Sequence, residues 1–482
     1  MPITLTGDHT AAQILVEDES LIEDNCLEQI RTLIDHPAFT EPIRMMPDTH
    51  VGSGAPIGFT MPLPDRVVPN IVGVDVGCGM AATNLGAELP LSGAEREQRV
   101  RDAVPMGQSI HDYDDAPHLV DEFPFERAND VFDRFDAAHR ERFGHPIEPI
   151  EFGFDGYDGA YFKQLCERVL AGRPQGMGYL IRSAGTLGGG NHFIEFAKAR
   201  ESGEYWLVIH SGSRYLGKSI AEYWQDRATQ CREADAIRET LPDEYAEYLK
   251  FDLETVGDEE LFTWVTGGMG ESHLRKEAIR TSFDAESVDE VFRALSRPRA
   301  AIADRDESLD WLAGREAHGY YVDMLFAQQY ARWNRDLMSD AVCAALGIDP
   351  VDRFQSIHNY IDFRDLTIRK GATPARAGQR LVIPFNMAEG SLLARGKGNP
   401  QYHRTAPHGA GRTMSRREAH ESLTLEAFEG AMAGVYSESV GEAVLDEAPM
   451  AYKPVDSIID SITPTAETVD RLDVVHNLKA IE

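Results

Sequence analysis

The side chains best suited to chemistry in this chain lie in short segments that are spread over most of its length. Six such segments stand out: "MPDTHVGSG" (46–54), "GVDVGCGM" (73–80), "GTLGGGNHFIE" (185–195), "VIHSGSR" (208–214), "HNY" (358–360) and "HGAGR" (408–412). Most contain glycine, which lets a backbone turn sharply and lets other atoms come close to it. Because strands that carry these motifs recur from residue 45 to residue 412 with helical sequence between them, we predict one interwoven domain rather than a chain of modules.

The predicted fold class is mixed α/β or α+β, in a single large domain over residues 1–482 with central β-sheets flanked by helices and a helical insertion. Buried strands are predicted for "IVGVDV" (71–76), "YWLVIH" (205–210) and "RLVIPF" (380–385). Residues 85–175 and 220–330 are largely helical in pattern.

The chain has a net charge of −33, which opposes general attraction to nucleic acid and favours solubility. Residues 364–417 run against this trend, with eleven Lys and Arg against two acids. That stretch is a candidate surface for phosphates, and a solvated basic face is an equally good interpretation of it.

The first twenty residues include acidic side chains and lack the positively charged start and apolar block of a signal peptide. No apolar run approaches the ~20 residues that a membrane span requires. The five cysteines are scattered and never form a CxxC pair. These features predict a cytoplasmic protein with reduced thiols.

Five side chains in these segments are candidate metal ligands: Asp75, Cys78, His192, His210 and His358. Each signal is weak by itself, since a histidine at a strand end is more often a core residue, and "GTLGGGNH" lacks the GK[ST] ending of a P-loop. Together they supply a carboxylate, a thiolate and three imidazoles, which is enough for two ions if the sulfur bridges them. Ligand type alone favours zinc, with manganese or iron as alternatives.

His408 lies outside this set, between Arg404 and Arg412 in the basic stretch. A histidine among arginines beside a metal site is suited to attack a phosphate and form a phosphoramidate, while the cations neutralise the phosphate oxygens.

The same residues lie in motifs that resemble those of RtcB-type RNA ligases. The resemblance is carried, in order along the chain, by "MPDTHVGSGAPIG", "VGVDVGCGMAA", "GTLGGGNHFIE", "VIHSGSRYLG", "HNYIDF", "RKGATPARAGQ" and "RGKGNPQYHRTAPHGAGRTMSR". It runs from about residue 44 to residue 478, and residues 85–175 and 220–330 are interpreted as family-variable or inserted material. Enzymes of this family use GTP and manganese to join an RNA 3′-phosphate or 2′,3′-cyclic phosphate end to a 5′-hydroxyl end.

The resemblance implies roles for individual residues. Asp75, Cys78 and His192 would hold one Mn²⁺, and Cys78, His210 and His358 a second, with Cys78 as the bridge. His408 would be the nucleophile that takes GMP from GTP. The implied nucleotide-binding residues are His408 with Asn191, Glu195, Asn386, Glu389, Gly409, Ala410, Gly411 and Tyr452. The residues implied to contact RNA or phosphate are Asp48, Arg214, Asn359 and Arg412.

The implied reaction has three steps. A cyclic phosphate end is hydrolysed to a 3′-phosphate, GMP passes from His408 to that phosphate, and the 5′-hydroxyl of the second strand displaces GMP. This activity would serve tRNA splicing or the repair of damaged RNA, and an archease-type activator is a candidate partner.

Two positions depart from the family pattern. The family usually has "IPGSM" where this chain has "IPFNM" (383–387), which puts Phe385 in place of a glycine. Family members also typically end in a Lys-Gly pair beyond "VVHxL", whereas Lys479 in "VVHNLKAIE" is not at the matching position. These departures motivate two alternatives to a ligase: a dinuclear metal phosphoesterase that opens cyclic-phosphate RNA ends without joining them, and a non-catalytic binder of broken RNA ends.

Overall fold

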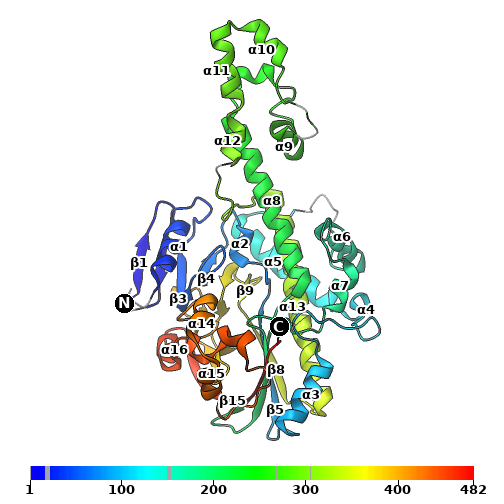
Figure 1. The fold of residues 1–482 in the computed structure, drawn as a ribbon, viewed down its shortest axis with the longest axis vertical. Helices are drawn as coiled ribbons and strands as arrows, with labels where there is room; N and C mark the ends of the chain where they lie inside the picture. Colours follow the sequence, from blue (N-terminus) through cyan, green and yellow to red (C-terminus); the bar gives the residue numbers. More distant parts are fainter. Residues whose placement is uncertain are drawn as a thin grey trace.

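The computed structural model describes residues 2–16, 22–148, 154–267, 270, 272–303 and 305–481. Helices and β-sheets are interleaved along these residues, which confirms the predicted mixed fold class (Figure 1). No helix in these ranges is both long and apolar enough to cross a bilayer.

The strands of the described residues are β1 (Ile3–Thr6), β2 (Ala11–Ile14), β3 (Ile43–His50), β4 (Ile57–Pro62), β5 (Gly79–Gly86), β6 (Phe193–Ala199), β7 (Tyr205–Ser211), β8 (Asp352–Ile357), β9 (Asn359–Ile361), β10 (Thr367–Lys370), β11 (Ala372–Pro374), β12 (Arg380–Asn386), β13 (Gly390–Gly396), β14 (Thr405–Pro407) and β15 (Ala466–Leu478). Their α-helices are α1 (Asp24–Ile34), α2 (Pro69–Val72), α3 (Gly93–Ala103), α4 (Leu119–Glu122), α5 (Phe125–Phe143), α6 (Gly159–Val169), α7 (Met177–Arg182), α8 (Arg214–Thr240), α9 (Asp258–Thr266), α10 (Lys276–Ser282), α11 (Ala285–Leu295), α12 (Arg297–Ala303), α13 (Gly314–Leu346), α14 (Arg416–Ser422), α15 (Leu425–Ala431) and α16 (Val455–Ile462).

Two large sheets form the body of the protein. The first has seven antiparallel strands in the order β12-β13-β15-β6-β7-β5-β8. The second has six strands in the order β1-β2-β3-β4-β10-β9, of which β2 and β3 run parallel. β11 and β14 form a small sheet of their own. The chain builds β1–β4 of the six-stranded sheet, then β5–β8 of the seven-stranded sheet, returns to the first sheet for β9 and β10, and completes the second with β12, β13 and β15, so that the two sheets are interwoven along the chain.

The long helix α13 supports the seven-stranded sheet. It packs against β5 and β7, and also against α3, α5 and α8. Buried apolar side chains follow one another along the helix, including Tyr320, Phe326 and Tyr330 in the main hydrophobic cluster. Met338 and Val342, nearer its end, belong to a second cluster with side chains of β6 and β7. One helix therefore joins two parts of the core.

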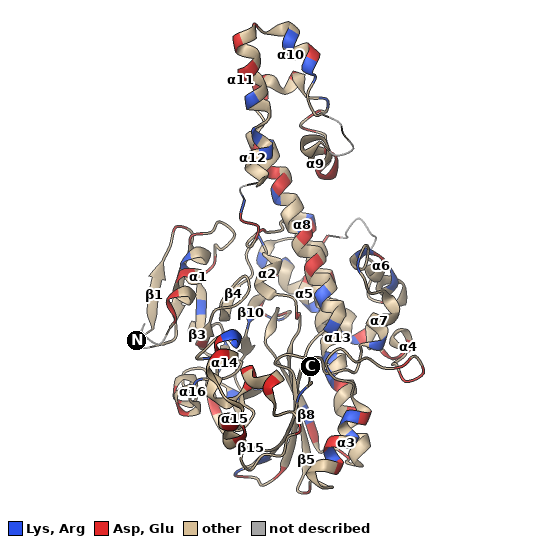
Figure 2. Cartoon of the chain, viewed as in Figure 1, with Lys and Arg blue, Asp and Glu red and all other residues tan. Residues whose placement is uncertain are grey.

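A helical arm projects from the body (Figure 1). It begins with α8, continues through α9 to α12, and returns to the body as α13. The far half of the arm has a hydrophobic cluster of its own, which includes Ile237, Leu261, Val291 and Leu295. Acidic and basic residues are interspersed along α8 (Figure 2).

Two of the three predicted strands are confirmed, and one is wrong. "YWLVIH" lies in β7 and "RLVIPF" in β12. In contrast, "IVGVDV" is divided between the short helix α2 and a turn. Pro69 occupies the first helical turn, where its missing N–H is tolerated. Gly73 then has a φ of +84°, a conformation that ends the helix and that only glycine adopts readily.

Candidate functional site

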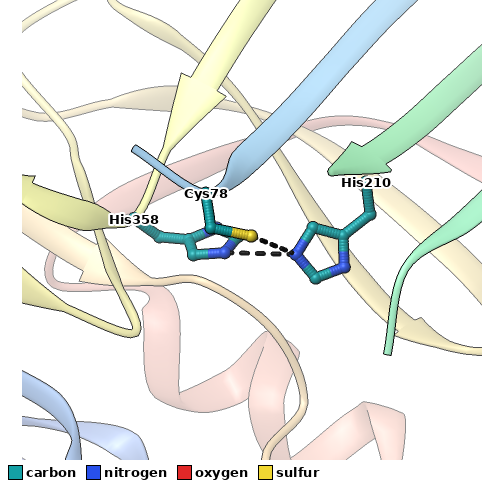
Figure 3. Close-up of side chains that lie close together, drawn as sticks. All are labelled: Cys78, His210 and His358. Carbon is teal, nitrogen blue, oxygen red and sulfur yellow. Dashed lines mark hydrogen bonds between the residues drawn. The ribbon is translucent and has the colours of Figure 1, made fainter. Parts of the chain in front are cut away.

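Strand register brings Cys78, His210 and His358 together where the adjacent strands β7, β5 and β8 end (Figure 3). Gly79, the first residue of β5, pairs with Ser211 on one side and with Ile357 on the other. The residues next to these partners therefore meet beside Cys78. Cys78 Sγ lies 3.2 Å from His210 Nε2, which lies 3.2 Å from His358 Nε2.

Asp75 and His192 form a second group with the same sulfur. His192 Nε2 lies 3.0 Å from Asp75 Oδ2 and 3.6 Å from Cys78 Sγ. Close backbone approach makes this possible, because a Cβ at Gly212 would lie 1.9 Å from Asp75 Oδ1. The groups Asp75–Cys78–His192 and Cys78–His210–His358 each have ligand atoms within 4.8 Å of one another. These are the two sets that the sequence predicts, with Cys78 common to both.

The histidines of these groups are oriented for metal binding. Nδ1–H of His192 donates to the Leu187 carbonyl (2.9 Å), and Nδ1–H of His210 donates to that of Asn191 (3.1 Å). His210 Nε2 therefore presents its lone pair to the cluster and His192 Nε2 faces Asp75, and such backbone support is typical of metal-binding histidines. Burial lowers the pKa of both His210 and His358 well below the usual value, which keeps the rings neutral.

The carboxylate and the thiol respond differently to this environment. Burial raises the pKa of Asp75, but the hydrogen bond and charge of His192 outweigh it and the pKa is lowered below its ordinary value. Burial and the nearby Asp75 raise the pKa of the Cys78 thiol. A bound cation reverses this preference, because a coordinating thiol loses its proton. One carboxylate, one sulfur and three imidazoles thus fit divalent cations of the transition series.

His408 lies directly beside the second group. Its ring centroid is 4.8 Å from that of His358. Asp48, which is fully buried, accepts hydrogen bonds through Oδ2 from His408 Nδ1 (2.8 Å) and from the His408 backbone N–H (3.2 Å). The carboxylate therefore fixes the orientation of the ring, with Nδ1 toward Asp48.

His408 also lines a cavity of about 600 Å³. Seven further residues with predicted roles at the nucleotide line it: Asn191, Glu195, Asn386, Gly409, Ala410, Gly411 and Tyr452. Burial raises the pKa of Glu195 to about 8, although Asn477 and Ser391 donate to its carboxylate at 3.3 Å. Glu195 is therefore protonated at neutral pH and can donate a hydrogen bond as well as accept one.

A charged group that the sequence analysis did not assign forms another part of the wall. Lys479 is 2% exposed, and its Nζ donates to Glu447 Oε2 at 3.0 Å. Tyr452 donates to the same oxygen at 2.8 Å, and Arg416 lies 3.0 Å from the other. Burial raises the pKa of Glu447, but Lys479 and Arg416 outweigh it and lower the pKa to about 2. Although Lys479 does not match the family motif, it is a cation in the cavity.

Some predicted residues lie elsewhere or have structural partners. Glu389 borders a smaller neighbouring hollow and pairs with Arg471. Asn359 accepts from the Gly371 backbone N–H at 2.8 Å. Arg214 begins α8 and donates to Thr186 and to the Gly107 carbonyl. Arg412 lines the cavity and donates to the Asp446 carbonyl.

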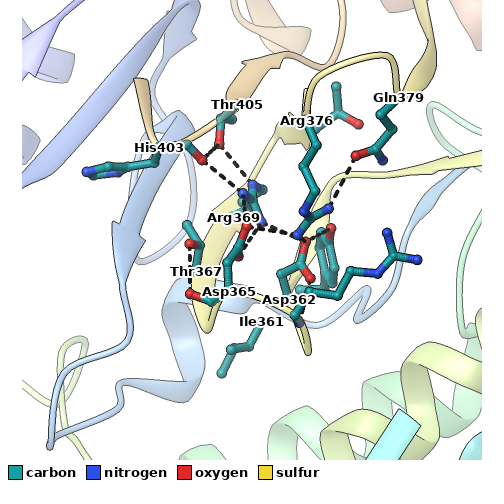
Figure 4. Close-up of polar contacts among 12 residues, drawn as sticks. Ile361, Asp362, Asp365, Thr367, Arg369, Arg376, Gln379, His403 and Thr405 are labelled. Atoms are coloured by element: carbon teal, nitrogen blue, oxygen red, sulfur yellow. Dashed lines mark hydrogen bonds and ion pairs between the residues drawn. The ribbon is translucent and has the colours of Figure 1, made fainter. Parts of the chain in front are cut away.

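Neither interpretation of the basic stretch 364–417 describes all of it. Arg369 is fully buried and pairs with Asp362 (2.9 Å) and Asp365 (3.3 Å), and Arg376 joins the same two acids (Figure 4). Arg369 also donates to Thr405 and to the His403 carbonyl, next to β14. Since β14 leads directly to residue 408, part of the positive charge serves to hold the segment that carries His408 in place.

Two buried residues of α13 support the site, and sequence patterning did not single them out. Arg335 donates to the carbonyls of Gly77 (2.8 Å) and Ser211 (2.7 Å), and Asn334 binds the backbone at Gly185 and Gly212. They hold the glycine turns that carry the ligand side chains. The available signal was the polar pair itself, within a helix whose sequence is rich in apolar and aromatic residues.

Comparison with known proteins gives a consistent result. The family model described as tRNA-splicing ligase RtcB matches residues 29–258 and 282–480. RNA-splicing ligase RtcB of Escherichia coli is 28% identical over 480 residues, which cover 95% of this chain and 94% of that protein. tRNA-splicing ligase RtcB of Nanoarchaeum equitans is 26% identical over 495 residues, covering 92% of this chain and 88% of that protein.

Proposed function

The chain belongs to the RtcB family and is an RNA ligase, and on that premise we propose that it joins RNA 3′-phosphate or 2′,3′-cyclic phosphate ends to 5′-hydroxyl ends with Mn²⁺ and GTP. The observation that carries the proposal is the position of His408. Its ring lies beside the Cys78–His210–His358 group and lines the cavity that also contains Glu195 and Lys479.

Two Mn²⁺ ions would be held by Asp75, Cys78 and His192 and by Cys78, His210 and His358. When bound, they supply positive charge that offsets the charge accumulating on phosphate oxygens. The ligand atoms already face one another in both groups, which supports this assignment. The side chains therefore need little rearrangement on binding.

The nucleotide step uses the Asp48–His408 pair. His408 Nε2 attacks the α-phosphorus of GTP, an N–P bond forms, and the bond to pyrophosphate breaks. Asp48 retains the proton on Nδ1 and stabilises the positive charge that develops on the ring. The cavity residues Glu195 and Lys479 would bind the purine edge, and their donors would fix the orientation of the nucleotide.

The RNA steps follow by exchange at phosphorus. Water first opens a cyclic phosphate to a 3′-phosphate where one is present. An oxygen of the 3′-phosphate then displaces His408 from GMP, which regenerates the free imidazole. The 5′-hydroxyl of the other strand finally attacks the activated 3′-phosphate, and GMP leaves. Transfer of GMP to the 3′-phosphate converts a poor leaving group into a better one, which the last step expels.

An adduct assay tests this proposal. The protein is incubated with Mn²⁺ and GTP labelled at the α-phosphate, and then with RNA halves that carry cyclic phosphate and 5′-hydroxyl ends. We expect an acid-labile, alkali-stable label that is absent from His408→Ala, followed by joined RNA. Opening of the cyclic phosphate without label or joining would instead support the phosphoesterase alternative. Lys479 argues against that alternative, because a phosphoesterase without a nucleotide has no need of a lysine in the cavity.

Such RNA ends arise in tRNA splicing and in RNA damage. We therefore propose tRNA and damaged RNA as the physiological substrates. The negative overall charge limits non-specific RNA binding. We propose a cytoplasmic location, and an archease-type protein remains the candidate activator. Joining assays with and without that partner would measure its effect.

A further inference from the structure

We propose that His139, His145 and His318 form a second, separate metal site that binds a divalent transition-metal ion, with Zn²⁺ as the best-suited ion. Their ligand atoms all lie within 4.8 Å of one another. The three rings approach each other edge to face or tilted, with centroids 5.1–5.6 Å apart. Three imidazoles without a carboxylate or a thiolate form a nitrogen donor set that favours zinc over manganese or magnesium.

The fold builds this cluster from two helices. His139 lies in the last turns of α5, and His318 lies near the start of α13. Gly144 ends α5 with a φ of +81°, and this left-handed residue turns the chain so that His145 returns toward the helix. The turn is fixed further by Asp136, which accepts from the Ile147 backbone N–H at 2.6 Å.

The histidine tautomers suit an incoming ion at two of the three positions. His139 Nδ1–H donates to the His145 carbonyl (3.0 Å), and His145 Nδ1–H donates to the Pro146 carbonyl (3.2 Å). A carbonyl can only accept, so the Nε2 lone pair of each neutral ring is left for a ligand. His318 Nδ1 instead accepts from the Glu148 backbone N–H (3.1 Å), and an ion would compete with that amide.

Burial makes the cluster more suitable for a metal than for protons. His139 is 3% exposed and His318 is 5% exposed, while His145 is exposed and provides access from solvent. Burial lowers the pKa of both inner rings, that of His318 to about 4, so neither ring carries a positive charge at neutral pH. Water or the exposed Glu148 carboxylate would complete a four-ligand set.

The site is distinct from the catalytic groups. His318 and Arg335 are seventeen residues apart on α13, which corresponds to about 25 Å along the helix. A metal at the histidine cluster would fasten the end of α5 to the start of α13. Its role would therefore be structural, since the same helix supports the site through Arg335.

The test measures zinc binding by a variant that lacks the sulfur of Cys78. Full-length Cys78→Ala protein is dialysed against Zn²⁺, and its metal content and thermal unfolding are recorded. We expect about one Zn²⁺ per chain and a raised Tm. His145→Ala in this background should weaken binding roughly tenfold or more, and exposed His145 is safe to change without unfolding the protein. His118→Ala, at another exposed histidine, is the matched control and should bind as before.

Co²⁺ provides a second readout. In Cys78→Ala protein, we expect a visible spectrum of nitrogen-ligated Co²⁺ without a thiolate charge-transfer band, and this spectrum should be lost in His139→Gln. Two results would overturn the proposal: no Zn²⁺ retained by Cys78→Ala, or retention that is the same with and without His145 and His139.

Discussion

Asp48 Oδ2 lies 2.8 Å from Nδ1 of His408 and also accepts the backbone N–H of the same residue. Two hydrogen bonds thus fix one imidazole both in position and in tautomer. We predict that Asp48→Asn lowers the rate of GMP transfer to His408 by roughly 10²-fold or more, because the charge that stabilises the developing imidazolium is lost. Single-turnover labelling with GTP measures the rate. Unchanged labelling in a folded, metal-loaded variant would show that Asp48 has no such role.

The sharing of Cys78 by two ligand groups predicts a coupled loss of metal. Cys78→Ala should reduce bound Mn²⁺ at both groups, whereas His192→Ala should affect chiefly the group that contains Asp75. Metal analysis after dialysis in Mn²⁺ measures the difference. Cys231→Ala removes a thiol far along α8 from the site and should leave the metal content unchanged. Full Mn²⁺ retention by Cys78→Ala would exclude the bridging role.

The raised pKa of Glu195 predicts a pH dependence of stability. Its pKa of about 8 in the folded protein exceeds the ordinary value of 4.5 for a glutamate in the unfolded chain, so the folded state binds the proton more tightly than the unfolded state. The resulting stability is present below about pH 4.5 and is lost as the pH rises through 8. Glu195→Gln, which is neutral at every pH, should lack this decline. Denaturant unfolding of both proteins from pH 5 to pH 9 would reveal the difference. The same change of unfolding free energy with pH in the wild type and in Glu195→Gln would contradict the prediction.

Lys479 is predicted to contribute to nucleotide binding despite its unmatched position. Lys479→Met removes a charge-assisted donor from the cavity wall, a loss of about 1.5–3 kcal/mol, or roughly tenfold to a hundredfold in affinity for GTP. Titration calorimetry with GTP measures the affinity. Lys397→Met, at an exposed lysine outside the cavity lining, is the control. Equal affinities would limit Lys479 to its pairing with Glu447.

Phe385 is predicted to matter for stability. Its ring is 2% exposed and packs in a cluster with Ile383 and Leu392, and Phe385 stands at the position where the family usually has glycine. Phe385→Ala should lower the free energy of unfolding by about 3–5 kcal/mol, as expected for the loss of a buried ring. Phe363→Ala, which truncates a partly exposed ring, should have a smaller effect in the same urea titration.

The ligand set could be predicted from the sequence because its residues lie where strands meet glycine turns. His210 at the end of an apolar strand and Cys78 between two glycines are signals of that kind. Lys479 and Glu447 could not be found in this way, since their contact depends on β15 crossing beside β6 and on the fold of a segment distant in sequence. The predicted strand at "IVGVDV" was wrong because Pro69 and Gly73 dominated over the apolar pattern. Whether residues 85–175 and 220–330 are insertions stays a prediction.

The arm formed by α8 to α12 buries its outer apolar side chains in a cluster separate from those of the two sheets. The family model also passes over residues 259–281, which include most of α9 and nearly all of α10. A projection that supplies its own core can be lengthened, shortened or exchanged during evolution while the catalytic chemistry is inherited intact. We therefore expect differences among relatives in the molecules that they bind to be found at the tip of this arm.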